Sequence, residues 1–107
     1  MDMNKVCLTG KIVVDMKQSK TPNCQVGVFC IVVHGCTWKN QKQEDTVSVF
    51  NCILYRQMVE ATSSFMKKGR KVGLVGHLKQ ELWDRDGQIK SHTVIIVEQV
   101  FPLSVAQ

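Results

Sequence analysis

Apolar and polar residues alternate over several stretches of this chain, which is the pattern of half-buried β-strands. On this basis the sequence predicts five strands, over residues 5–14, 25–34, 46–54, 71–83 and 91–100. The second stretch is apolar at both its odd-numbered and its even-numbered positions, as expected for a strand that is covered on both faces. Gly10 interrupts the first stretch and predicts a bulge or bend there.

The connections between these stretches are richer in polar and turn-forming residues. Residues 17–23 predict a turn, and residues 35–45 predict an exposed polar loop in which Trp38 is unusual. Asp86 and Gly87 form an Asp-Gly pair, which is a strong hairpin signal. The last two predicted strands are therefore expected to form a hairpin.

One segment has helical rather than strand periodicity. Residues 56–68 place apolar side chains at helical spacing and end in two lysines before Gly69, which predicts a helix closed by a left-handed glycine. Five strands with one helix between the third and the fourth is the order of the oligonucleotide/oligosaccharide-binding (OB) fold. The expected fold is therefore all-β with one helix, a five-stranded Greek-key barrel with extended hairpin loops, in one domain spanning residues 1–107.

Composition and charge narrow the class of protein. The chain has 107 residues, of which 44% are hydrophobic, so a single domain with a real core is expected. Its formal charge of +5 favours an anionic partner such as nucleic acid or an anionic membrane. The apolar runs are too short to span a bilayer, and the first fifteen residues lack a secretion signal. A cytoplasmic protein is expected, with no membrane partner and with an organellar or phage origin left open.

The chain contains cysteines and histidines, which could bind a metal or act in catalysis, but their spacing does not indicate either role. The five cysteines are expected to be reduced thiols, mostly buried. Cys24, Cys30 and Cys36 are spaced by six, without the close pairs of structural zinc sites, so no metal site and no cofactor are expected. The three histidines lie in different segments. The chain is therefore expected to be no enzyme, and a reactive cysteine remains the least supported alternative.

Aromatic residues beside basic ones give the stronger signal. Non-specific binders of single strands need cations that follow the phosphates and flat rings that stack on any base. The candidate pairs are Trp38 with Lys39 and Lys42, Tyr55 with Arg56, and Trp83 with Arg85 and Lys90. The alternative for Tyr55 is a place in the core. Phe29, Phe65 and Phe101 are expected in the core, and Phe50 in the core or at an interface.

Several motifs together resemble the bacterial-type single-stranded DNA-binding protein family. They are Asn4-Lys5-Val6 with Leu8, Gly10 and Asp15; the segment from Asn51 to Tyr55 with Glu60; Lys67-Lys68-Gly69 followed by Val72, Val75, Gly76 and Leu78; and Trp83 with Asp86-Gly87-Gln88. No single motif is diagnostic, but their order and spacing are similar to those of the family over roughly residues 4–103. At a third-strand position where the family often has a stacking aromatic, this chain has Val49.

The resemblance implies a role for each matching residue. It implies base stacking by Tyr55 and Trp83, and Trp38, the third stacking candidate, lies within one position of another stacking aromatic of the family. The phosphate-contact candidates are Lys5, Lys11, Lys39, Lys42, Arg56, Lys71, Lys79, Arg85 and Lys90. It also implies a homotetramer formed by pairing first strands, with a dimer as the alternative. Val6, Leu8 and Phe50 are the interface candidates.

The resulting hypothesis is sequence-independent binding and protection of single-stranded DNA during replication, recombination and repair. Two alternatives stay open: a dimeric OB-fold accessory protein of primosomes or recombination, and an OB-fold subunit that binds another protein. The sequence ends at Gln107 without the acidic tip through which the family recruits replication and repair proteins. Recruitment of such partners is therefore left open.

Overall fold

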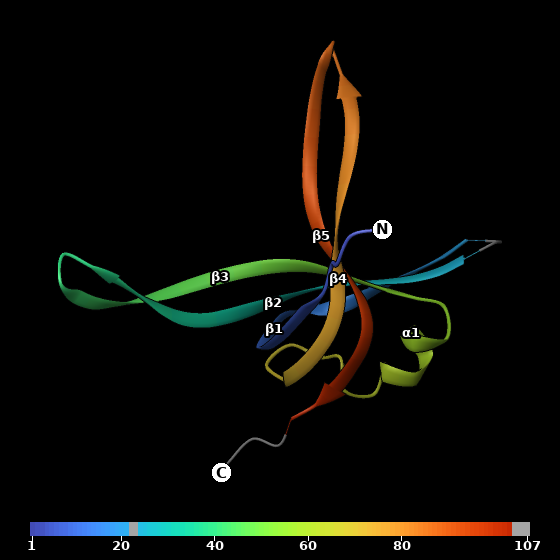
Figure 1. Ribbon diagram of the computed structural model, residues 1–107. Coiled ribbons are helices and arrows are strands. Elements are labelled where there is room, and N and C mark those ends of the chain that lie inside the picture. Colours follow the sequence, from blue (N-terminus) through green and yellow to red (C-terminus); the bar gives the residue numbers. More distant parts are fainter. Residues whose placement is uncertain (22–23, 104–107) are drawn as a thin grey trace.

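Five strands close into a barrel in the computed structural model, which describes residues 1–21 and 24–103 (Figure 1). The elements are β1 (Val6–Thr21), β2 (Cys24–Lys39), β3 (Lys42–Tyr55), α1 (Gln57–Thr62), β4 (Lys71–Arg85) and β5 (Gln88–Pro102). The strand order around the barrel is β1-β2-β3-β5-β4, and only β3 and β5 pair in parallel among the pairings described. This order, with a helix between β3 and β4, confirms the predicted OB-fold.

Two long hairpins project from the barrel as fingers. β2 and β3 stay paired as far as Lys39 and Lys42, so the predicted loop over 35–45 is wrong and Trp38 lies in a strand. Asn40 and Gln41 both have positive φ, which suits the tight turn of a twisted hairpin. The prediction failed because both faces of a projecting ribbon meet water, so no apolar face marks it as a strand.

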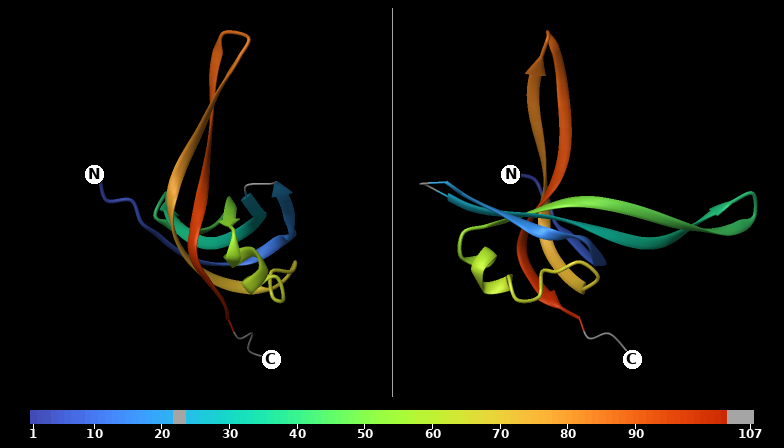
Figure 2. Two further views of the ribbon diagram at one scale, coloured as in Figure 1. Left: turned by 90° about the vertical axis from the view of Figure 1, so that its right-hand side faces the viewer. Right: turned by 180° about the vertical axis from the view of Figure 1, so that it is seen from behind.

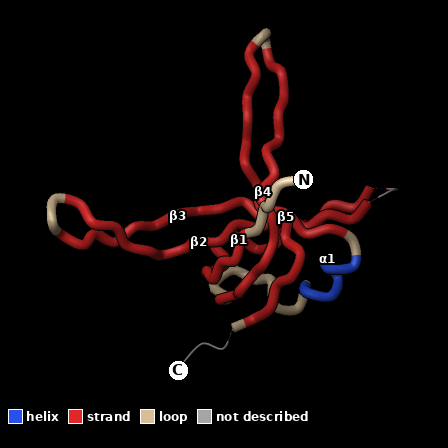
Figure 3. The backbone as a smooth tube through the Cα atoms, viewed as in Figure 1, coloured by secondary structure: helices blue, strands red, loops and turns tan. Residues whose placement is uncertain are grey.

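The β4–β5 finger ends at the predicted turn. Asp86 and Gly87 have φ values of 54° and 77°, as a two-residue hairpin turn requires. Figure 3 shows both fingers as continuous strands with short turns at their tips. The two fingers point in different directions, and the β1–β2 hairpin extends opposite to the β2–β3 finger (Figures 1 and 2).

β1 bends where the barrel needs it, but not at the predicted residue. Its register with β2 shifts between Ile12 and Val14 and again before Lys17, rather than at Gly10. Gly10 is needed for another reason: a Cβ there would lie 2.6 Å from the carbonyl oxygen of Val32. The predicted turn over 17–23 is also wrong as far as Thr21, which belongs to β1; Pro22 and Asn23 lie outside the described residues.

The barrel interior is filled by alternate residues of the strands. Phe29, Ile31, Leu54 and Leu74 are almost fully buried, and burial of each such side chain stabilises the fold by about 1.5–3 kcal/mol. Phe65 packs against this core, as predicted. Phe101 does not, and its prediction was wrong: its side chain is 46% exposed, and its ring covers Gly73 on the outside of the barrel. Gly73 leaves room for that ring because it has no side chain.

The helix is shorter than predicted and ends at Thr62. The Thr62 hydroxyl donates to the carbonyl oxygen of Met58 at 2.6 Å, and the Ser63 hydroxyl donates to that of Glu60 at 3.1 Å. Hydroxyls that bond nearby backbone groups favour helix ends over helix continuation. Gly69 has a positive φ but lies in the connection to β4, where its N–H donates to the Ile12 carbonyl. α1 lies on the side of the barrel away from the β4–β5 finger (Figure 2).

Candidate nucleic-acid interface

The outer face of the β2–β3 ribbon forms one long exposed surface. Cross-strand partners in a sheet project to the same side, and successive residues alternate between sides. Phe29 and Leu54 point into the core, so the residues that alternate with them along β2 and β3 point outward. We call this surface the outer strip; it comprises the even-numbered residues 26–38 of β2 and the odd-numbered residues 43–55 of β3.

Two of the predicted stacking residues lie on the outer strip. Trp38 is 72% exposed near the tip of the finger, and Tyr55 is 36% exposed at the opposite end, on the barrel. Tyr55 is therefore a surface residue, and the alternative of a core tyrosine was wrong. Between the two rings lie Val47 and Val49, which are both well exposed. The middle of the strip is thus apolar but carries no ring.

The β4–β5 finger continues this surface. Asn51 Nδ2 lies 3.4 Å from His92 Nε2, which joins the strip to β5, and the Cys30 thiol donates to Asn51 Oδ1 at 2.9 Å. His92 is paired in register with Glu81, and two residues further along the finger Lys90 is paired with Trp83. Trp83 therefore projects to the same side as His92, and it is 47% exposed. The three predicted rings lie on one continuous surface, but at separate places on it.

The same register places three predicted phosphate contacts on the Trp83 side of the β4–β5 finger. These are Lys79, Arg85 and Lys90. Two more, Lys11 and Lys71, face each other across β1 and β4, and Lys11 is also paired with Val32 of the strip. Five of the predicted cations thus lie on or beside this surface.

The other predicted cations lie elsewhere or are already paired. Lys39 and Lys42 are cross-strand partners at the finger tip, on the ribbon face opposite to Trp38. Arg56 follows Tyr55 with a φ of 57° and lines a shallow hollow beside it. Lys5 Nζ lies 2.7 Å from a carboxylate oxygen of Glu98. That hydrogen bond is the main reason why the pKa of Glu98 is lowered.

The residues predicted for an oligomer interface face inward in this chain. Val6, Leu8 and Phe50 are partly buried and pack against the barrel core. The register agrees, because Leu8 is the partner of the core residue Leu74. Only the part of each of these side chains that is still exposed is therefore available to an interface.

The five thiols differ in their burial. Burial raises the pKa of Cys52 to about 12, with Cys30 adding to the shift. Cys52 is the buried thiol, whereas Cys7 and Cys36 are exposed, so the expectation of mostly buried cysteines was wrong. Within residues 1–21 and 24–103, no three histidine, cysteine or acidic side chains are grouped so as to hold a metal ion. No helix in that part of the chain is long and apolar enough to cross a membrane.

Several residues of this surface were not singled out from the sequence. His34 and Val47 are cross-strand partners on the outer strip, and Lys17 is paired with Val28, so it projects to the same side. His92 joins the two fingers. The alternation of side chains along each strand could have identified these residues from the sequence. It does so only once the hairpins are known to be long enough to include them.

The sequence model of the single-strand binding protein family matches residues 3–103. The chain belongs to the single-strand binding protein family. This membership confirms the predicted resemblance and agrees with a binding protein rather than an enzyme.

Bacterial members of the family have similar sequences. The chain is 31% identical over 100 residues to single-stranded DNA-binding protein 2 of Listeria monocytogenes, covering 92% of this chain and 62% of that protein. It is 28% identical over 102 residues to single-stranded DNA-binding protein 1 of Lactococcus lactis, covering 94% of this chain and 67% of that protein. The chain thus spans about two thirds or less of the length of these relatives.

Solved structures of the family share the fold. The Plasmodium falciparum SSB in a complex with ssDNA superposes with a TM-score of 0.86 at 20% identity, covering 97% of each chain. A small single-stranded DNA-binding protein from Streptomyces coelicolor gives a TM-score of 0.76 at 20% identity, covering 95% of each chain. The family's OB-fold barrel is therefore preserved at low sequence identity.

Proposed function

We propose that this chain acts as one domain that binds single-stranded DNA without sequence preference and protects it during replication, recombination and repair. The observation that carries the proposal is the exposure of Trp38, Tyr55 and Trp83 on one continuous outer surface. Rings on a surface stack on any base, and neighbouring lysines neutralise the phosphates. The names of the family and of its bacterial members support the same activity.

The surface favours single strands over duplexes. In a duplex the base faces are stacked on one another, so they are not available to the three rings, whereas the phosphates remain accessible. A protein that used charge alone would bind both forms in proportion to their charge density. The exposed rings are the feature that predicts discrimination.

A fluorescence titration tests the proposal. Stacking on Trp38 and Trp83 should quench tryptophan emission when oligothymidine is added, and a duplex of equal length should bind far more weakly. The logarithm of the affinity should fall with the logarithm of the salt concentration at a slope of about −0.7 per phosphate neutralised. Equal affinity for the duplex, or an affinity insensitive to salt, would show that this surface is not the binding site.

The assembly we propose is a homo-oligomer, a tetramer or a dimer, acting in the cytoplasm. β1 pairs with β4 over Val6–Lys11 but with β2 only from Lys11 onward, so among the described residues the β2-facing edge of 6–10 has no strand partner. An open edge is a template for pairing with a second copy. The exposed parts of Val6 and Leu8 would then be covered by that copy. Light scattering over a range of concentrations distinguishes monomer, dimer and tetramer.

A further inference from the structure

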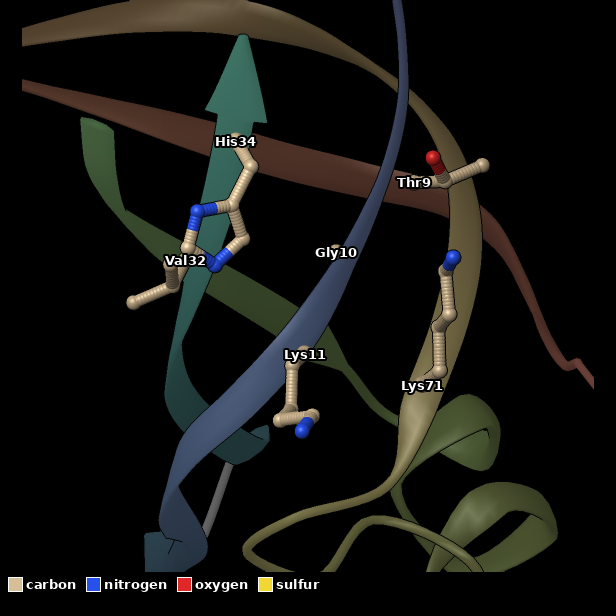
Figure 4. A pocket seen from close by; sticks show the side chains of 6 residues that line it. All are labelled: Thr9, Gly10, Lys11, Val32, His34 and Lys71. Carbon is tan, nitrogen blue, oxygen red and sulfur yellow. The ribbon is translucent and has the colours of Figure 1, made fainter. Parts of the chain in front are cut away.

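A hollow of about 200 Å³ lies on the outside of the barrel between β1, β2 and β4 (Figure 4). Its lining combines cationic, titratable and small side chains: Thr9, Gly10, Lys11, Val32, His34 and Lys71. The two lysines come from facing positions on β1 and β4, and the histidine comes from β2. None of the six lining residues is acidic. The hollow therefore suits a small anion.

The hollow borders the outer strip. Val32 lines it and is the cross-strand partner of both Lys11 and Val49, so the three residues form a row across β1, β2 and β3. His34 lies two residues further along the strip, opposite Val47. A strand whose bases follow the strip would thus pass with its backbone next to the lysines.

We propose that this hollow binds one phosphodiester of the bound strand and that His34 makes this contact dependent on pH; the inference rests on the proposed function. Two ammonium groups and a hydroxyl can together satisfy the oxygens of a phosphate, and hydrogen bonds between ionised groups are the strong ones. A protonated imidazole adds a third positive charge. A neutral imidazole adds only one N–H donor.

The charges around His34 set the sign of the pH effect. Lys11 and Lys71 line the hollow with His34 from β1 and β4, whereas Asp45 of β3 and Cys36 line a separate, neighbouring hollow that also includes His34. A phosphate between the lysines neutralises part of their charge and favours the imidazolium. Binding should therefore take up a proton, and the affinity should rise as the pH is lowered from 8 to 6.

The first test compares variants of the hollow with a matched control. Lys11→Gln and Lys71→Gln should each weaken binding of oligothymidine several-fold, and the double variant should reduce the salt slope by about 0.7, because the two lysines share one phosphate. Lys67→Gln removes the same charge from the connection after α1 and should leave both quantities near their wild-type values. His34→Gln should match wild type at pH 8 and bind several-fold more weakly at pH 6. Thermal melting of each variant checks that the barrel is intact.

The second test follows the imidazole itself. NMR titration of the His34 ring, assigned by its loss in His34→Gln, should show a higher pKa in the complex than in the free protein. The oligonucleotide is used with and without a 5′-phosphate, and both should give the same result, because the bound group is an internal phosphodiester. An effect confined to the phosphorylated oligonucleotide would overturn the assignment.

The outcomes separate the two proposals. If wild-type protein does not bind oligothymidine at low salt, the proposed function fails and this inference fails with it. If wild type binds but the variants of the hollow behave like Lys67→Gln, and the pKa of His34 does not change, only this inference fails.

Discussion

Trp38 and Tyr55 project from the same face of the β2–β3 ribbon, although they lie at its opposite ends. Trp38 is the partner of Gln43 and Tyr55 is the partner of Val26, and the two positions on each strand differ by an even number. The face turns with the twist of the ribbon but stays continuous. A strand that contacts both rings must therefore follow the length of the outer strip, past Val47, Val49 and Asn51.

The first prediction concerns Trp83 on the other finger. Trp83→Ala should weaken binding of oligothymidine by about 1–3 kcal/mol, the usual contribution of a stacked base. Leu82→Ala is the matched control, because Leu82 is also exposed, at 64%, but projects from the opposite face of the same finger. Fluorescence anisotropy of a labelled oligonucleotide measures both. Equal losses for the two variants would mean that Trp83 does not stack on a base.

The second prediction concerns the ring-free middle of the strip. Val49→Trp should strengthen binding, by up to about 1–3 kcal/mol, because it places a ring between Trp38 and Tyr55 where the side chain is already 59% exposed. Ser48→Trp adds the same ring to the opposite face and should not strengthen binding. The affinities are compared by the same anisotropy titration. A gain for Ser48→Trp as large as that for Val49→Trp would contradict a path along this face.

The third prediction concerns two glycines of β4. A Cβ on Gly76 would lie 2.2 Å from the backbone oxygen of Ile96, whereas a Cβ on Gly73 would meet the ring of Phe101 at 2.6 Å. Gly76→Ala should lower the free energy of unfolding by about 1–3 kcal/mol, because backbone cannot move aside without breaking the pairing with β5. Gly73→Ala should cost less, since the half-exposed ring can turn away. Urea unfolding measures the free energy of unfolding of both variants. A larger decrease for Gly73→Ala than for Gly76→Ala would contradict this account.

The fourth prediction concerns the buried thiol. The pKa of Cys52 is raised from 9.0 to about 12 in the folded protein, so its thiol stays neutral where an unfolded chain would have a thiolate. The stabilising effect is present below pH 9 and is lost as the pH rises from 9 towards 12. Urea midpoints measured across this range should fall more steeply for wild type than for Cys52→Ala. Parallel pH profiles would show that Cys52 does not contribute.

Alkylation gives a fifth, independent prediction for the thiols. At pH 8 in the native state, iodoacetamide should modify the exposed Cys7 and Cys36, while Cys52 should react only after unfolding. Mass spectrometry of tryptic peptides identifies the modified residues. Modification of native Cys52 at the rate of Cys36 would be inconsistent with its burial.

Local signals in the sequence were enough to predict the barrel and the types of residue that the surface uses. Alternation identified the five strands, and Asp86-Gly87 identified the turn of the β4–β5 finger, because both depend on neighbours in sequence. The helix was found, but its end at Thr62 was missed because hydroxyl bonding to nearby carbonyls competes with the apolar periodicity. The exposure of Trp83 followed from its parity with the lysines of the same strand.

Only the tertiary structure decided which of these residues act together. Trp38 belongs to a strand because β2 and β3 pair far beyond the barrel, where alternation disappears since both faces are wet. Lys5 is paired with Glu98, and Lys11, Lys71 and His34 line one hollow, although these residues lie far apart in sequence. Periodicity shows which side of a strand a residue occupies, whereas the neighbour across the sheet depends on register and closure of the barrel. These are set by the packing of all five strands at once.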